Sequence, residues 1–331
     1  HGVRTIDDNL TDAAYHAHIR AICHGVVDSA ESFCRINRKT IGGNIPVYDY
    51  FAGYEDRPVL PESMRPEVEA FMTVMGADAS DSSLVAWANS PAVSVFTPDV
   101  DSVYASLGCI ERDLGNMLSR AAAEGLALPR RRYAAVVWGR PESIVFCDSV
   151  MLVALNHYLG ESYAGYSHLA PYLRRAKTPG RLPYDMAEAI VAVSIPYVRK
   201  EGSTALSRML YEGALVEACR RLVGGSDAQV LGYGDDEYSE LLSREGEMWR
   251  VLVSKGLIYS TLPSDASRLV SPAPYTTLLS SRTPGRAGRF IGYRIVRSYM
   301  ERYPEIPLSE LLSPKWYSSD DVLRLSRYVG K

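Results

Sequence analysis

One long helix limits the possible folds of this 331-residue chain more than any other feature of its sequence. Ser203 or Thr204 can cap this helix, and Gly224-Gly225 can end it. Its faces are apolar nearly all round, so we expect it to be buried on most sides. Gly213 stands in its middle, where glycine costs up to about 1 kcal/mol relative to alanine. We therefore expect another stretch of backbone to approach closely at Gly213.

Apolar residues at helical spacing predict further helices before and after a short β region. These helices are expected from Asp12 to about Phe33, after Ser63-Met64-Arg65-Pro66 and on to Met75, from Asp99 to Glu124, from about Asp236 to Ser254, and onward from Thr283-Pro284. The runs Tyr133–Trp138 and Ser143–Phe146 predict either a β-hairpin or two sheet strands. Met151–Leu159 follows as a third strand or a helical turn.

This layout predicts an α+β protein that is predominantly helical. A helical N-terminal part is expected over residues 1–128, packed with an α+β part over residues 129–331. The boundary between them is soft, and a single compact unit is the alternative.

Composition and charge exclude several classes of protein. The 36 basic and 39 acidic residues leave a formal charge of -3, so no global field gathers nucleic acid. No run of about 18 apolar residues is present, so the sequence predicts no membrane-spanning helix. The five cysteines form no CxxC pair and have no histidine at ligand spacing, which argues against zinc and redox motifs. We expect no metal, no cofactor and no nucleic-acid partner, and leave open a bridge between Cys23 and Cys34.

Two glutamates, Glu212 and Glu245, are the main candidates for chemistry. Most of the residues three and four positions from each are apolar, so both carboxylates should be partly buried and need partners. One interpretation makes them an acid and base pair, or metal ligands. The other pairs each with a structural arginine. The helix after Thr283 supplies four arginines, namely Arg286, Arg289, Arg294 and Arg297.

Glycines and histidines give weaker signals. Gly285, Gly288 and Gly292 share one face of a helix, which lets a neighbouring helix come close, and no strand precedes them as a phosphate-binding loop requires. His157 is the only histidine in a distinctive motif, Asn156-His157-Tyr158-Leu159-Gly160. It is either a structural histidine or part of a binding cleft.

These segments resemble the gliding-motility lipoprotein B family of Bacteroidetes-type bacteria. The likeness is carried by a motif ending in Tyr158-Leu159-Gly160, by Met209-Leu210-Tyr211-Glu212-Gly213, by Arg244-Glu245-x-x-Met248-Trp249, by Leu257-Ile258-Tyr259-Ser260, by Pro284-Gly285-Arg286 and by the run that follows it to Met300. Arg244 replaces the family's asparagine. The resemblance covers about residue 133 to the end and implies an N-terminal lipid anchor, removed before His1, on a domain in the periplasm. It also implies a connection with gliding or type IX secretion.

A fainter resemblance links the chain to zincin-like metallopeptidases. Tyr211 and Leu215 occupy the positions of both histidines in their His-Glu-x-x-His motif, and Glu245 resembles the later glutamate of the gluzincin branch. This implies a degenerate zincin-like C-terminal part. Tyr211, Glu212 and Glu245 then mark a former catalytic site, and Asn156, His157, Arg289 and Tyr293 are the candidate binding cleft. Our first hypothesis is a non-catalytic lipoprotein domain that binds a protein or envelope partner; the alternative is a hydrolase or metallopeptidase using Glu212 and Glu245.

Overall fold

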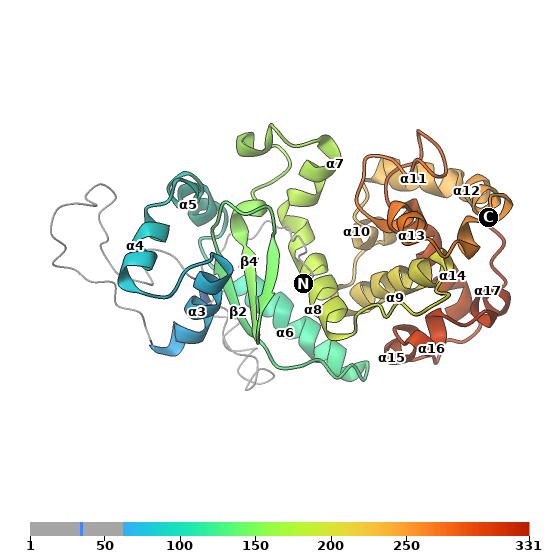
Figure 1. The fold of residues 1–331 in the computed structure, drawn as a ribbon, viewed down its shortest axis with the longest axis horizontal. Coiled ribbons are helices and arrows are strands. Elements are labelled where there is room, and N and C mark those ends of the chain that lie inside the picture. Colours follow the sequence, from blue (N-terminus) through green and yellow to red (C-terminus); the bar gives the residue numbers. More distant parts are fainter. Residues whose placement is uncertain (1–33, 36–61, 331) are drawn as a thin grey trace. The chain divides into compact units, whose positions relative to one another are not determined.

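The computed structural model describes residues 34–35 and 62–330 (Figure 1). The helix expected from Asp12 to Phe33 lies outside these residues, as does the question of a bridge between Cys23 and Cys34. The chain forms two compact units, which we describe separately. We call them the sheet unit (His1–Asn116 and Pro129–Ala189) and the helical unit (Met117–Leu128 and Ile190–Lys331). The boundary near residue 128, drawn from sequence composition, stays a prediction.

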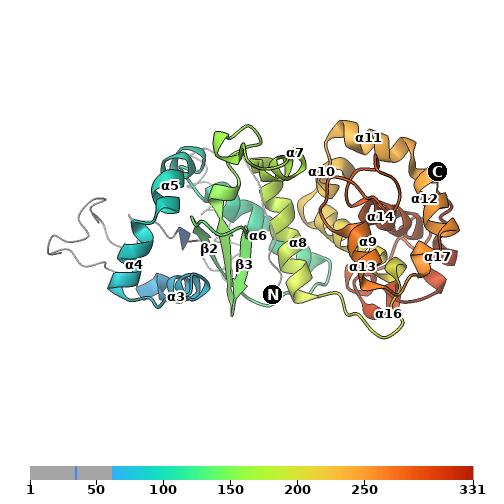
Figure 2. The ribbon, with the colours of Figure 1, turned by 45° about the horizontal axis from the view of Figure 1, so that its top comes forward.

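The sheet unit contains a four-stranded mixed sheet with the order β1-β2-β4-β3; Figure 2 shows this sheet with β2 and β3 labelled. Its strands are β1 (Cys34–Arg35), β2 (Arg132–Val136), β3 (Ile144–Cys147) and β4 (Val150–Ala154). β2 pairs in parallel with both β1 and β4, whereas β3 and β4 are antiparallel. The runs predicted as a hairpin or as two strands are therefore two strands separated by β4. The region Met151–Leu159 was predicted as a strand or as a helical turn, and it contains one of each: β4 leads directly into the 3-10 turn η2 (Leu155–His157).

Helices surround this sheet in the same unit. They are η1 (Glu62–Met64), α3 (Arg65–Val74), α4 (Asp81–Ala88), α5 (Pro91–Val103), η3 (Ala164–Tyr166), α7 (Pro171–Arg174), η4 (Arg175–Lys177) and η5 (Pro179–Arg181), with α6 (Gly108–Ala123) and α8 (Leu182–Ser194) divided between the units. The prediction of α3 is confirmed. It packs on β2, β3 and β4, where the buried ring of Phe71 meets Trp87 edge-on and stacks on Trp138.

The single helix predicted from Asp99 to Glu124 is wrong, because the chain breaks between α5 and α6. Tyr104 leaves helical geometry and is fully buried, and its hydroxyl donates a 2.6 Å hydrogen bond to the carbonyl of Tyr158. Ser106 then receives the N–H of Gly108 on its hydroxyl at the start of α6. A buried tertiary contact therefore interrupts a periodicity that by itself favours one helix.

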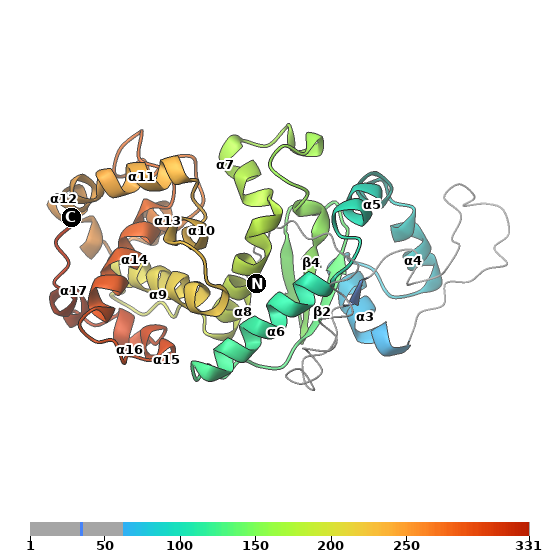
Figure 3. The same ribbon diagram turned by 180° about the vertical axis from the view of Figure 1, so that it is seen from behind.

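The helical unit is built around α9 (Ala205–Val223) and α14 (Ala287–Met300), which lie side by side (Figures 2 and 3). Its other elements are α10 (Asp227–Leu231), α11 (Asp235–Ser243), α12 (Glu245–Ser254), η6 (Leu257–Tyr259), α13 (Pro263–Val270), α15 (Leu308–Leu311), α16 (Pro314–Tyr317) and α17 (Asp321–Ser326). Thr204 caps α9 by accepting the N–H of Ser207, and Gly224 ends it, as predicted. Of the described residues, none forms a helix long and apolar enough to cross a membrane.

Two glycines set the closeness of α9 and α14. A Cβ atom on Gly213 would lie 2.4 Å from the backbone carbon of Gly292, and one on Gly292 would lie 1.9 Å from the carbonyl oxygen of Met209. The predicted backbone approach at Gly213 is thus confirmed. The expectation that Gly285, Gly288 and Gly292 share one helix face is wrong for Gly285, because α14 begins only at Ala287. Gly288 and Gly292 do lie on α14, and neighbouring helices approach closely at both, as expected. Gly285 instead lies against Ala273, and Gly288 against Leu269 of α13.

Candidate functional site

The middle of α9 holds Glu212 between two arginines. Glu212 is 3% exposed, and its two oxygens each accept a hydrogen bond. Arg208, one turn earlier on α9, donates from Nη2 at 2.7 Å, and Arg289 of α14 donates from Nη1 at 3.0 Å. Arg289 is only 1% exposed, so the pair of opposite charges is buried. The close crossing at Gly213 and Gly292 brings α14 near enough for Arg289 to reach Glu212.

The residues beside Glu212 are part of the core. Tyr211 is 1% exposed, donates its hydroxyl proton to the carbonyl of Ile195 at 2.9 Å, and packs against the rings of Tyr197 and Tyr317. Leu215 is fully buried. A metal ligand must present a nitrogen, oxygen or sulfur lone pair to the ion. Leu215 has none, and the hydroxyl of Tyr211 is engaged with the backbone.

Glu245 lies in a different environment, at the first residue of α12. Arg294 of α14 donates from Nε to both carboxylate oxygens, at 3.0 and 3.1 Å, and the hydroxyl of Tyr328 donates to one of them at 2.8 Å. A carboxylate is favoured at a helix N-terminus, where backbone N–H groups are unpaired. Burial raises the pKa of Tyr328 above its usual range, and the neighbouring charge of Glu245 raises it further. Tyr328 therefore stays protonated as a donor to Glu245.

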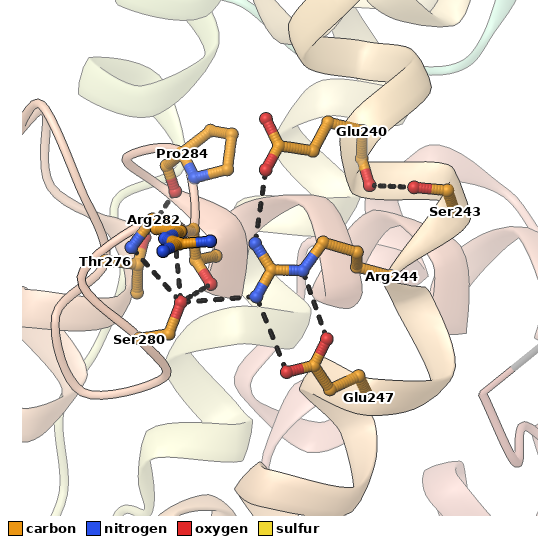
Figure 4. A network of polar contacts seen from close by, with 9 residues as sticks. Glu240, Ser243, Arg244, Glu247, Thr276, Ser280, Arg282 and Pro284 are labelled. Atoms are coloured by element: carbon orange, nitrogen blue, oxygen red, sulfur yellow. Dashed lines mark hydrogen bonds and ion pairs between the residues drawn. The ribbon is translucent and has the colours of Figure 1, made fainter.

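Arg244 is the one non-helical residue between α11 and α12, whereas the sequence predicted one helix from about Asp236 to Ser254. That prediction is wrong, since α11 ends at Ser243 and α12 starts at Glu245. Figure 4 shows the Arg244 side chain between Glu240 and Glu247, and Nη2 also donates to the hydroxyl of Ser280. Ser280 in turn accepts the N–H groups of Arg282 and Thr283. One arginine thus joins the break between two helices to the following loop.

Arginines from α14 neutralise both candidate glutamates, as the second interpretation of the sequence expected. Different groups hold the two carboxylates: Arg208 and Arg289 bind Glu212, whereas Arg294 and Tyr328 bind Glu245. An acid and base pair needs carboxylates that reach a substrate and exchange protons with it. Each of these is at most 3% exposed and carries an arginine.

A third buried glutamate, Glu217, was missed by sequence reasoning. It is fully buried on α9, five residues after Glu212. Arg220 binds it through Nε at 2.8 Å and Nη2 at 2.7 Å, and Arg221 binds it through Nε at 2.9 Å. Arg297 of α14 stands at 3.7 Å from the same carboxylate. The signal that could have revealed Glu217 was the pair Arg220-Arg221, three and four residues further along an otherwise apolar helix.

In the sheet unit, Asn156 and His157 tie η2 to neighbouring loops. Asn156 accepts the N–H of Trp138 and donates from Nδ2 to the Trp138 carbonyl at 2.8 Å. Nδ1 of His157 is hydrogen-bonded to the hydroxyl of Ser143, which is 1% exposed. Burial, assisted by the charge of Lys177, lowers the pKa of His157 to about 3. The imidazole is therefore neutral at physiological pH.

The four residues of the candidate cleft fall in two units. Asn156 and His157 belong to the sheet unit, whereas Arg289 and Tyr293 belong to the helical unit. Tyr293 is fully buried and donates its hydroxyl proton to Asp227 at 2.7 Å. All four side chains have protein partners within their own unit, and a shared cleft stays a prediction. Over residues 62–330, no three His, Cys, Asp or Glu side chains gather in an arrangement that could hold a metal ion.

The model of the family described as "Gliding motility protein GldB" matches residues 49–330, which is most of the chain. The comparisons with curated proteins and with solved structures give no match.

Proposed function

This chain belongs to the gliding motility protein GldB family of lipoproteins, and we propose that it acts there without catalysis, by binding a protein partner in the cell envelope. We further propose that a lipid anchor holds it at the outer membrane of a Bacteroidetes-type bacterium, with the domain in the periplasm. In this proposal the α9–α14 core descends from a zincin-like scaffold whose catalytic site has become structural.

One observation carries the non-catalytic part of the proposal, namely the burial of Glu212 between Arg208 and Arg289. A general base must be within hydrogen-bond reach of the proton that it removes. Both oxygens of Glu212 already accept hydrogen bonds from guanidinium groups, so neither is left to remove a proton from a substrate. The buried Tyr211 and Leu215, at the positions of the zincin histidines, agree with this reading.

Exposed apolar side chains in the helical unit support binding to a partner. Tyr259 is 64% and Leu262 59% exposed, and Val198, next to Arg199 in the chain, is 43% exposed. Arg199 donates to the carbonyl of Thr261 at 3.0 Å, which holds these two segments together. Arg199 and the adjacent Lys200 add positive charge. We propose that this surface meets an acidic protein surface, since large exposed apolar residues with a polar rim are typical of interfaces.

The test is complementation in cells that need this protein for gliding or secretion. The double variant Glu212→Gln/Arg289→Met removes the carboxylate together with its buried cation, so it avoids the uncompensated charge of either single change. We expect the double variant, at normal protein level, to keep most of the activity, whereas Tyr259→Ser/Leu262→Ser loses it while remaining folded. The control for Tyr259→Ser/Leu262→Ser is Val253→Ser, which replaces another exposed apolar residue and should keep the activity.

The opposite result for the two double variants would support the alternative that the protein is a hydrolase. If the folded Glu212→Gln/Arg289→Met protein lost activity completely and the surface variant kept it, Glu212 would have a chemical role, and the hydrolase alternative would replace the binding proposal.

A further inference from the structure

Three guanidinium groups surround a single carboxylate at the C-terminal half of α9. Arg220, Arg221 and Arg297 all lie within ion-pair distance of Glu217. Arg221 also donates to Glu124 at 2.6 Å. Of the three arginines, only Arg221 is hydrogen-bonded to this second carboxylate. Asp227 also acts electrostatically on Arg220 and accepts hydrogen bonds from Tyr238 and Tyr293. With its carboxylate included, the cluster has three positive and three negative charges, so unused hydrogen-bond donors, rather than an excess of charge, distinguish it.

The two outer arginines have free donors. Arg220 uses Nε and Nη2 on Glu217, and within the described part of the chain its Nη1 makes no hydrogen bond. Arg297 is 3.7 Å from Glu217 Oε2, which is too far for a hydrogen bond. None of the described residues accepts a hydrogen bond from its guanidinium. The side chains of Arg220 and Arg297 are 31% and 36% exposed, so these donors can reach solvent.

The same carboxylate oxygen places these two arginines next to each other. Arg220 Nε lies 2.8 Å and Arg297 Nη1 3.7 Å from Oε2 of Glu217. Two guanidinium groups this close repel each other unless an anion lies between or beside them. Glu217 supplies one negative charge from the buried side. The exposed side offers a position for a second anion.

We propose that Arg220 and Arg297 form a binding site for a phosphate group. Guanidinium donors match the oxygens of phosphate in a forked geometry, and a phosphate presents at least two oxygens to two neighbouring arginines. The buried carboxylate of Glu217 holds the guanidinium group of Arg220 in position through two hydrogen bonds. The site is separate from Glu212 and does not depend on whether that residue is catalytic. The phosphate can belong to a lipid headgroup or to a soluble molecule.

Titration of the full chain with inorganic phosphate at pH 8 and constant ionic strength tests the site, with nuclear magnetic resonance shifts as the readout. We expect a saturable response in the wild type. Arg297→Gln should weaken it at least about ten-fold while keeping the hydrogen bonds of Glu217 to Arg220 and Arg221. Arg297→Lys keeps the charge without the fork and should give an intermediate affinity. Arg250→Gln, at an exposed arginine of α12, should bind like the wild type.

Vesicle flotation then separates the two sources of phosphate. Binding to phosphatidylglycerol vesicles but not to phosphatidylcholine vesicles, lost in Arg297→Gln, assigns the site to an anionic headgroup. A phosphate response without flotation assigns it to a soluble ligand. Absence of a saturable phosphate response in the wild type, or an equal response in the folded Arg297→Gln protein, overturns the proposal whatever the vesicles show.

Discussion

Glu212 and Glu217 are carried by the same helix five residues apart, yet their surroundings differ in one respect. The arginine that α14 sends to Glu212 is 1% exposed, whereas the one that it sends to Glu217 is 36% exposed along its side chain. In both clusters the two carboxylate oxygens accept hydrogen bonds, and the arginine from α9 is 31% exposed. We call the first cluster closed because Arg289 is buried. We call the second open because Arg297 reaches solvent and makes no hydrogen bond with a described residue. A buried arginine whose donors cannot reach solvent cannot bind a ligand. A partly exposed arginine with unused N–H donors can do so. Burial of the arginine, rather than burial of the glutamate, separates the two.

Both clusters depend on the contact between Gly213 and Gly292, so a substitution there should have the largest effect. In Gly292→Ala the new methyl group would lie 1.9 Å from the Met209 carbonyl oxygen, and the helices must move apart. We expect a loss of at least about 3 kcal/mol in the free energy of unfolding, or no folding. Urea denaturation measures it. Gly234→Ala, where a Cβ would meet nothing within 4 Å, should change stability little. Equal stability of both variants would show that the close approach is not needed.

Removing each carboxylate in turn compares the clusters directly. Glu212→Gln leaves Arg289 buried without its counter-charge, and we expect a loss of about 3–5 kcal/mol. Glu217→Gln should cost less, about 1–2 kcal/mol, because Arg220 and Arg297 can turn to water. Chemical denaturation of the two variants gives both values. A larger loss for Glu217→Gln would contradict the distinction between a closed and an open cluster.

His157 in the sheet unit gives a test that uses pH. Its pKa of about 3 in the folded protein is below the unfolded value of 6.5, so the unfolded chain takes up a proton first as pH falls. The contribution of this histidine to stability is complete above pH 6.5 and is lost between about pH 6.5 and 3, at up to about 1.4 kcal/mol per pH unit. Denaturation of the wild type and of His157→Gln at several pH values measures this, and in the variant the free energy of unfolding should no longer fall with pH by this amount between pH 6.5 and 3. An unchanged slope would show that His157 is protonated without difficulty in the fold.

The sequence predicted those parts of the fold that depend on local chemistry. The caps of α9, the glycine crossing and the helix α3 follow from residue type and spacing. Two helix breaks were not predictable in this way. Tyr104 is held by the carbonyl of Tyr158, and Arg244 by Ser280, which are partners 54 and 36 residues away in the chain. Local periodicity contains no information about such contacts.

The partners of the residues in the candidate site were also not predictable from local sequence. The sequence identified Glu212 and Glu245 as buried and supplied arginines to pair with them, but it could not assign Arg289 to one and Arg294 to the other. That assignment depends on how α14 crosses α9. Glu217 was missed, although Arg220 and Arg221, three and four residues further along the helix, mark it as a carboxylate with partners. Residue spacing does not show that such an ion pair is buried, and this carboxylate is fully buried.

Arg297→Gln should have the smallest effect on stability of all these changes. Its ion pair with Glu217 is long, its side chain is 36% exposed and it makes no hydrogen bond with a described residue, so the free energy of unfolding should change by no more than about 0.5 kcal/mol. Denaturation alongside the wild type measures this. The same substitution is expected to weaken phosphate binding at least about ten-fold. A residue whose loss leaves the fold unchanged but weakens binding is held in place for a ligand, so a stability loss above about 2 kcal/mol in Arg297→Gln would instead assign Arg297 to the core cluster.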